Sequence, residues 1–375
     1  MKKIILFATF ALAAQCLYAQ HVTKGEIEFF KNPQEVYVPT KANEKARVDN
    51  VILLIGDGMG MGHVSASMYV NGGQLTMTGM GVCGWVKTQS ASDFTTDSAA
   101  SATAYATGHK TNNYSVSVDP EGRTLETVAE KIAPRGYSCG VVTTDFIGGA
   151  TPAAFYAHSS DRGDDVKVWK DLIASHLSFF AGGSQEAYEE LSDSLRSALE
   201  GNFKIVYDME DEPDAAKVGY FPALNQITDV KAPERKDWLA NATDFAISHL
   251  EKTSKKGFFL MVEGARIDKF SHKNDLNSVV LETLDFDKAV ERAVRFAEKD
   301  GHTLVVVTSD HETGGLILRK AKGAKDKVSA VFSSTGHTPS LVPLFAYGPR
   351  AHSFSKVMGN NEVGQAVIDI FSSRK

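Results

Sequence analysis

Short apolar runs alternate with longer segments of helical periodicity along most of this chain, from about residue 50 onward. The apolar runs have the length of buried strands and lie at 51–55, 139–142, 258–262, 303–307 and 341–347. The segments between them carry apolar residues on one helical face, most clearly at 123–134, 238–249 and 281–297. Strands that alternate with helices in this way favour a mostly parallel sheet flanked by helices. The sequence therefore predicts an α/β fold.

The size and charge of the chain limit its organisation and its partners. A chain of 375 residues with 43% hydrophobic content can bury a large core, and its length alone allows one large or two ordinary domains. No linker or repeat interrupts it, so we expect one domain over 20–375, with the polar, weakly periodic segment 184–235 as a surface insertion or cap. The formal net charge of −6 argues against nucleic acid as a partner, because binding its phosphates needs a basic surface. A small phosphate ester stays compatible, since bound cations can reverse the local potential.

The N-terminus resembles a secretory signal peptide. Two lysines precede an apolar run over 4–17, and a small residue, Ala19, stands at the expected cleavage point. We therefore expect residues 1–19 to be removed and the mature protein to be periplasmic or secreted. A lipid anchor on Cys16 is a weaker alternative because Gln15 precedes it. No later segment approaches about 18 uninterrupted apolar residues, so no transmembrane segment is expected.

Two cysteines, Cys83 and Cys139, remain after the expected signal peptide, each inside a strand-like run at 81–88 and 137–144. We interpret them as two buried thiols. Export would permit a disulfide, but pairing cannot be deduced from the sequence. Neither cysteine neighbours another ligand type, which excludes both as metal ligands.

Acidic and histidine side chains directly follow several of the predicted strands. In open α/β sheets, ligands bind outside the carboxyl ends of the strands. A single aspartate after a strand is more often only a cap of a helix or turn, but joint recurrence favours a shared site. The side chains concerned are Asp57, Glu263, Asp310 and His311.

Three further side chains extend this set of metal-ligand candidates. Asp268 and His272 are four residues apart, so one helical turn would point both at a single ion, although such pairs are also common on exposed helices. His337 lies alone downstream in a loop. Oxygen and imidazole donors without thiolate suit catalytic zinc, which keeps open positions for water or substrate.

Ser98 and Arg162 are the candidates for chemistry on an anion. Ser98 precedes the small-sided stretch 99–106, where a buried helix is expected whose N-terminus would favour an anion. A metal could activate its hydroxyl without a histidine partner. The purely structural alternative is that Ser98 only caps the helix. Arg162 could clamp two phosphate oxygens. Its default interpretation is a surface salt bridge with Asp161 or Asp164.

Six motifs together make the chain resemble the alkaline phosphatases. They occur in the family's order and span nearly the whole of the expected mature chain, which makes the resemblance specific. The motifs are Gly56-Asp57-Gly58-Met59-Gly60, the stretch 96–104, Ala150-Thr151-Pro152-Ala153 with His158 and Arg162, the stretch 262–268 with His272, Thr308-Ser309-Asp310-His311, and Gly336-His337-Thr338.

The resemblance implies a three-layer alkaline-phosphatase-like fold and a phosphomonoesterase with two zinc ions and one magnesium ion. A phosphoserine on Ser98 would be the intermediate, Arg162 would bind phosphate, and Lys269 occupies a position that touches phosphate through water in some relatives. The oligomeric state is not fixed by the sequence, and a homodimer is compatible with the family. The implied ligands are Asp268, His272 and His337 for the first zinc, Asp57, Asp310, His311 and the Ser98 oxygen for the second, and Asp57, Thr151 and Glu263 for magnesium.

Two other functions compete with this interpretation. A superfamily relative that hydrolyses phosphodiesters or sulfates would have similar metal ligands, but such relatives commonly use threonine or a modified cysteine where this chain has Ser98. A catalytically silent metal- or phosphate-binding surface protein should have lost a ligand or the nucleophile, and every one of those positions is present here.

One position departs from the family pattern. Many relatives carry an aspartate or histidine two residues before the threonine of Ala150-Thr151-Pro152, and this chain has Gly149 there. Glycine offers no donor, so we expect a weakened third site that loses magnesium before either zinc. Asp145, a few residues upstream, would compensate if its loop folded back.

Overall fold

The computed structural model describes residues 22–183, 185–209, 213–222, 230–320 and 325–372. The expected signal peptide, residues 1–19, lies outside these ranges. Within them, ten strands form one central sheet in which β14 runs antiparallel to both neighbours and all other pairings are parallel. Their order is β15 (Val357–Gly359), β3 (Val82–Lys87), β14 (Val342–Tyr347), β9 (Thr303–Thr308), β2 (Asn50–Gly56), β8 (Phe258–Gly264), β4 (Ser138–Phe146), β5 (Phe179–Gly183), β7 (Val218–Tyr220) and β6 (Lys204–Val206). The predicted mostly parallel α/β fold is confirmed.

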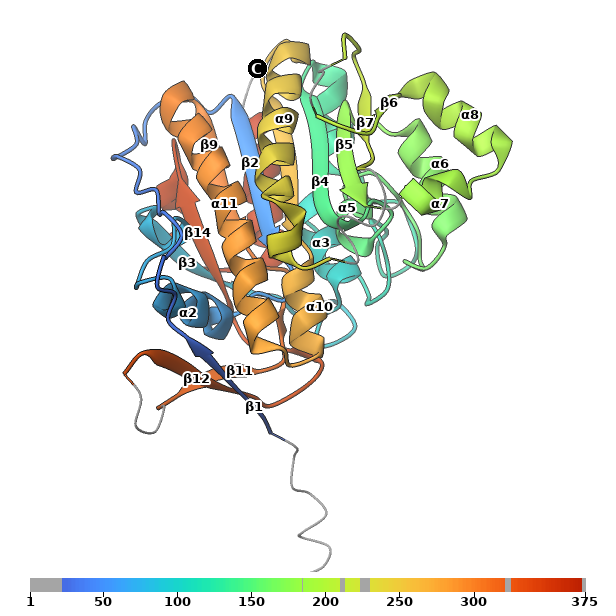
Figure 1. Ribbon diagram of the computed structural model, residues 1–375. Helices are drawn as coiled ribbons and strands as arrows, with labels where there is room; N and C mark the ends of the chain where they lie inside the picture. Colours follow the sequence, from blue (N-terminus) through green and yellow to red (C-terminus); the bar gives the residue numbers. More distant parts are fainter. Residues whose placement is uncertain (1–21, 184, 210–212, 223–229, 321–324, 373–375) are drawn as a thin grey trace, which may run out of the picture.

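Helices cover both faces of the sheet (Figure 1). One face packs on α2 (Met61–Val70), α9 (Trp238–Thr253) and α11 (Leu276–Asp300). The other packs on α3 (Ser98–Thr107), α4 (Val128–Ile132) and α12 (Asn360–Ser372). The remaining helices are α5 (Ala150–Ala153), α6 (Asp165–Ala174), α7 (Gln185–Glu189), α8 (Asp193–Asn202) and α10 (Arg266–His272). No helix in the described ranges is long and apolar enough to cross a bilayer.

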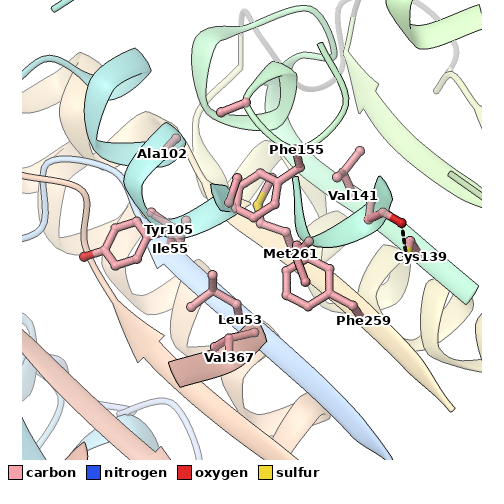
Figure 2. Close-up of a cluster of buried hydrophobic side chains, with 14 of the residues drawn as sticks. Leu53, Ile55, Ala102, Tyr105, Cys139, Val141, Phe155, Phe259, Met261 and Val367 are labelled. Atoms are coloured by element: carbon pink, nitrogen blue, oxygen red, sulfur yellow. Dashed lines mark hydrogen bonds between the residues drawn. The ribbon is translucent and has the colours of Figure 1, made fainter. Parts of the chain in front are cut away.

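Strand β2 shows why the central strands read as unbroken apolar runs. Leu53 and Ile55 point into the core beneath α3 and α12, as Figure 2 shows, while Ile52 and Leu54 point into the core beneath α9 and α11. All four side chains are fully buried. A strand covered on both faces has no solvent side, so it carries no alternating polar residues.

Two small sheets lie beside the main one. The first joins β1 (Thr23–Glu28), β12 (Lys327–Phe332) and β11 (Leu316–Arg319), and it lies below α2 in Figure 1. The second pairs β10 (Glu312–Thr313) with β13 (His337–Thr338). This second pairing brings His337 back beside the segment that follows β9.

Three expectations about local structure need correction. The helix predicted over 123–134 is α-helical only from Val128 to Ile132, because Thr127 accepts a hydrogen bond from the Glu130 backbone and sets the helix start there. Helix α11 begins at Leu276, earlier than 281, behind an Asp275 cap. Cys83 is exposed, because side chains alternate between the two faces of β3; it and buried Cys139 are both free thiols.

The segment 184–235 is more than a cap. Strands β6 and β7 extend the main sheet beyond β5, and Val218, Tyr220 and Phe221 are buried. Helices α7 and α8 lie to one side of the sheet in Figure 1. Residues 184, 210–212 and 223–229 of this segment lie outside the described ranges.

Candidate active site

The site begins at one row of residues across the sheet. Thr308 of β9, Ile55 of β2, Glu263 of β8 and Thr143 of β4 are aligned in register. Strands β9, β2 and β8 end at this row or one residue beyond it, whereas β4 continues to Phe146. The loops that follow β9, β2 and β8 therefore start side by side. Asp57 follows β2, Asp310 and His311 follow β9, and α5 and α10 follow β4 and β8.

The first group of candidate metal ligands is Asp268, His272 and His337, with ligand atoms within 4.8 Å of one another. The Nδ1 atom of His272 lies 2.5 Å from the Thr335 carbonyl oxygen, and that of His337 lies 3.0 Å from the Thr96 carbonyl oxygen. A backbone acceptor on Nδ1 fixes the ring and leaves Nε2 for a metal ion. Both Nε2 atoms face Asp268, at 3.3 and 3.6 Å.

The second group consists of Asp57, Asp268 and His311, again with ligand atoms within 4.8 Å. His311 also presents Nε2, 3.5 Å from Asp57 Oδ1 and 3.2 Å from Asp310 Oδ2. Its Nδ1 lies 3.1 Å from the Thr313 hydroxyl, which itself donates to Asp268 Oδ1 at 2.6 Å. Thr313 thus orients one residue of each group.

Buried charge in these groups fits metal cations. Among the described residues, Asp57 Oδ1 and Asp310 Oδ2 are buried without a hydrogen-bond partner, which is costly unless a cation faces them. Burial, and then repulsion by Asp310, Asp268 and Glu263, raises the pKa of Asp57 well above its usual value. For Asp268, burial acts in the same direction, but His272 and His311 outweigh it and lower its pKa. The donors are nitrogen and oxygen without thiolate, as zinc sites with open positions use.

Glu263 lines the same cavity as Asp57 and Thr151, and these three residues, called the oxygen-only pocket below, offer oxygen donors alone. The hydroxyl of Thr143 donates to the Glu263 carboxylate, and Thr151 at the start of α5 also hydrogen-bonds to it. Burial raises the pKa of Glu263 to about 8, with a further contribution from Asp145. Oxygen donors of this kind suit magnesium better than zinc.

Ser98 stands at the first position of α3, with its Oγ 3.2 Å from His311 Nε2. The purely structural interpretation of this serine as the helix cap is wrong, because Asp97 is the cap and accepts a hydrogen bond from Ala100 N–H at 3.0 Å. The Ser98 hydroxyl therefore does not cap the helix. Ser101, one turn further along α3, donates to the Asp310 carbonyl and fixes the helix against the loop that follows β9.

Arg162 reaches the same place from the loop after α5. Its Nη1 donates to Asp97 Oδ2 at 3.1 Å, so its partner is neither Asp161 nor Asp164. Its side chain is one-third exposed. One aspartate thus caps the helix that begins with Ser98 and positions the arginine beside it.

All the sequence-predicted site residues meet around one cavity of about 210 Å³. Asp310 and His311 are buried beneath it, and the structure also brings Asp145 to it, where Asp145 Oδ2 pairs with Lys269 Nζ at 3.0 Å. The lining includes Asp57, Ser98, Asp145, Thr151, Arg162, Glu263, Asp268, Lys269, His272 and His337.

Comparison with known proteins agrees with this geometry. The family model described as alkaline phosphatase matches residues 48–191 and 218–330. This chain belongs to the alkaline phosphatase family. It is accordingly a phosphomonoester hydrolase, and the resemblance drawn from the six motifs is confirmed.

Individual relatives cover most of the chain. The alkaline phosphatase of Escherichia coli K12 is 32% identical over 384 residues, covering 80% of this chain and 81% of the relative. Alkaline phosphatase 4 of Bacillus subtilis is 28% identical, with full coverage of both proteins. The alkaline phosphatase of the Antarctic bacterium TAB5 superposes with a TM-score of 0.79 at 35% identity, covering 87% of this chain and 98% of that one. The alkaline-phosphatase-like fold is thereby shown.

Several residues that support the site were not singled out from the sequence. Asp97 and Thr313 are examples, each adjacent in sequence or nearly so to a recognised residue. His63 is another: its Nδ1 accepts from Gly60 N–H and its Nε2 lies 2.9 Å from the Ser271 hydroxyl, linking the Asp57 loop to α10. Only the spacing of polar residues around the motifs could have indicated them.

His158 fixes the segment that leads to Arg162. Its Nδ1 lies 2.8 Å from the Ser117 carbonyl oxygen and its Nε2 lies 2.9 Å from Glu130 Oε1, so both ring nitrogens face acceptors. Burial disfavours the charged ring, but the Glu130 and Ser117 contacts outweigh it and raise the pKa of His158. The charged imidazolium is the form that satisfies both acceptors.

Glu130→Gln tests this contact. Glutamine can keep the helix-capping interaction with Thr127, but it removes the negative charge beside His158. Because the folded-state pKa of His158 is raised, the pair's stabilisation is fully present below the unfolded pKa of about 6.5 and is lost as pH rises through the folded value. We expect the variant to be less stable by on the order of 1 kcal/mol at pH 6. Melting curves of both proteins should converge by pH 9; a constant difference would contradict a titrating pair.

Proposed function

We propose that this chain hydrolyses phosphate monoesters through a phosphoserine on Ser98, with two zinc ions and one magnesium ion bound. The observation that carries the proposal is the placement of Ser98 Oγ, which is free of a capping role and lies 3.2 Å from His311 Nε2 at the cavity that Arg162 also lines. A nucleophile, a cation-binding cluster and an anion-binding guanidinium thus converge on one point.

The proposed zinc ligands follow the two groups of nitrogen and oxygen donors. Asp268, His272 and His337 would hold the first ion. Asp57, Asp310, His311 and the Ser98 oxygen would hold the second. Zinc ions bound there would lower the pKa of the serine hydroxyl and offset negative charge on the attacking and leaving oxygens.

Magnesium is proposed for the oxygen-only pocket. Asp57, Thr151 and Glu263 would supply three ligands, and water would complete the octahedron that magnesium prefers. A mutant of the TAB5 alkaline phosphatase, with a TM-score of 0.80 and 35% identity to this chain, has magnesium bound in a site termed M3. Magnesium bound in that relative supports the proposal of a magnesium site in this chain.

The residues of this chain would position the reacting atoms as follows. Helix α3 holds the Ser98 oxygen at its first turn, where the positive end of the helix dipole favours an anionic nucleophile and phosphate. Asp97 engages one guanidinium nitrogen of Arg162. The remaining N–H donors of the guanidinium stay available for nonbridging phosphate oxygens, where phosphoryl transfer chiefly needs electrostatic stabilisation.

The reaction would proceed in two displacements at phosphorus. Ser98 loses its hydroxyl proton to solvent, and its Oγ forms a bond to phosphorus as the ester P–O bond breaks; the alcohol leaves with a proton from solvent. Water then attacks the phosphoserine, releasing phosphate and restoring the hydroxyl. Deprotonation of the nucleophile in each step favours alkaline pH.

Relative rates on three substrates test the reaction class. With zinc and magnesium supplied, we expect a phosphate monoester to be hydrolysed far faster than a phosphodiester or a sulfate ester. A preference for the diester or the sulfate would favour the related hydrolases of the superfamily. Absence of turnover on all three would indicate a silent binding protein.

Arg162→Ala is expected to weaken inhibition by inorganic phosphate more than it disturbs metal binding. Hydrogen bonds to a charged group contribute about 1.5–3 kcal/mol, so the inhibition constant should rise by roughly 10- to 100-fold. Zinc content should stay the same, because the hydrogen bond of the Arg162 guanidinium is to Asp97, which is not a proposed metal ligand. Product-inhibition kinetics and metal analysis give the two readings.

Two variants control for this experiment. Arg162→Lys keeps the charge without the planar fork and should give an intermediate inhibition constant. Arg123→Ala removes an exposed arginine whose partners are Asp119 and Glu121. Phosphate inhibition that is unchanged in Arg162→Ala would leave the arginine as a partner of Asp97 only.

We also propose that the mature enzyme is exported and that residues 1–19 are removed. N-terminal sequencing of the protein recovered from cell fractions would test both points. An intact N-terminus in the cytoplasmic fraction would contradict them. Sedimentation of the same material would test the homodimer.

A further inference from the structure

Position 149 cannot hold a metal-binding side chain in this loop. A Cβ atom placed there would lie 2.9 Å from the Phe146 carbonyl oxygen, closer than side chains approach a backbone oxygen. The same oxygen accepts a hydrogen bond from Gly149 N–H at 2.8 Å, which holds the turn in place. The oxygen-only pocket must therefore complete its donor set from elsewhere.

Asp145 lies where such a donor is needed. It follows Thr143 in β4 with one residue between them, and its carboxylate lines the same cavity as Glu263, Thr151 and Gly149. Its backbone N–H donates to Thr143 Oγ1 at 3.0 Å, and that hydroxyl donates to Glu263. Asp145 is thus tied through one threonine to a proposed magnesium ligand.

The carboxylates that line this pocket are largely buried. Asp57 is only 6% exposed, and its Oδ1 has no hydrogen-bond partner among the residues that the structure describes. Glu263 is 2% exposed and lines the same cavity as Asp145. Buried carboxylates that repel one another are stabilised by a shared divalent ion.

We propose that Asp145 supplies the third metal site with the carboxylate that position 149 lacks, by binding the magnesium ion directly or through one of its waters. This inference rests on the proposed magnesium site. Under this proposal the third metal site is not weakened, because Asp145, four residues before Gly149 in the chain, supplies a carboxylate. Lys269, now paired with Asp145, would keep its ammonium beside the same cavity.

The contact with Lys269 offers a different role for Asp145, as an anchor for that lysine alone. The two roles predict opposite responses to loss of the lysine. If Asp145 binds the ion, Lys269→Gln removes a competing positive charge, and magnesium should bind as tightly or more tightly. If the ion pair merely supports the local structure, removal of either partner should have the same effect.

Magnesium titration of the zinc-loaded, magnesium-stripped enzyme by calorimetry tests the proposal. We expect Asp145→Asn to raise the magnesium dissociation constant by about 10- to 100-fold, with zinc content unchanged. Exhaustive dialysis should then remove magnesium from Asp145→Asn well before it does so from wild type. Lys269→Gln should leave the constant unchanged or lower it. Asp165→Asn, which removes an exposed acid at the start of α6, should have no effect.

Two results would overturn the proposal. One is a magnesium dissociation constant in Asp145→Asn within about twofold of wild type, far below the change expected for a lost metal-site partner. The other is an equal loss of affinity in Asp145→Asn and Lys269→Gln. Because calorimetry measures binding, the result can be read even if the wild-type enzyme fails to hydrolyse monoesters, which would overturn the proposed function separately.

Discussion

Ser98→Ala is expected to abolish phosphoenzyme formation and to lower kcat by several orders of magnitude, up to about 10⁶-fold. The effect should be large because the Ser98 hydroxyl stands at the start of α3 and lies 3.2 Å from His311 Nε2. Folding should be nearly unaffected, since Asp97 and not Ser98 caps the helix. Acid quench with labelled phosphate, followed by peptide mapping, measures the phosphoenzyme.

Ser98→Thr is the matched control for this experiment, because it keeps a hydroxyl at the same atom position. It should retain phosphoenzyme formation at a reduced rate. Zinc content and melting temperature of both variants should stay close to wild type. Labelled phosphate trapped on another residue of the wild-type enzyme would sink the assignment of Ser98 as nucleophile.

Removal of the metal ions is expected to have the second large effect, on activity and stability together. Each ion that binds only the folded protein stabilises it by about 4 kcal/mol when present at roughly 1,000 times its dissociation constant. Chelation should therefore abolish turnover and lower the melting temperature markedly. Re-addition of zinc and magnesium should restore both, whereas an unchanged melting temperature would contradict metal binding at the buried acids.

In the metal-free protein, loss of a buried carboxylate should raise the melting temperature, the opposite of its effect in the zinc-loaded protein. Burial raises the pKa of Glu263 to about 8 and raises that of Asp57 as well. Groups with raised folded-state pKa values bind more protons in the folded state, so stability falls as pH rises from their ordinary values through the folded ones. At pH 9, metal-free Asp57→Asn should therefore melt higher than metal-free wild type.

With zinc present the order should reverse, because the variant lacks a ligand oxygen. Thermal melts of both proteins with and without zinc give the comparison directly. If Asp57→Asn destabilises both forms equally, the carboxylate serves the fold and not an ion.

The sequence was sufficient for the general fold and for the enzyme family. Buried strands such as 51–55 carry apolar residues on both faces, and this pattern by itself predicts a parallel sheet covered on both sides. The acids and histidines just after those strands predict ligands, because parallel strands of one sheet end on the same side. Ser98 and Arg162 were identified through motifs whose residue order is linear and therefore visible.

Only the tertiary structure shows which side chains and strands pair across long sequence separations. Arg162 pairs with Asp97, 65 residues away, although Asp161 and Asp164 are nearer in sequence. Strands β6 and β7 are too short to show a periodicity, yet they join the sheet edge where a cap was expected.

The third metal site shows the same division. From the sequence, Gly149 marks only a missing donor. The structure shows that the Phe146 carbonyl oxygen excludes a side chain at 149 and that β4 continues far enough to bring Asp145 to the cavity. Residue types and their order determine which metal-binding side chains the chain has. Strand length, register and backbone contacts determine which of these side chains lie together, because these three features depend on packing between segments far apart in the chain.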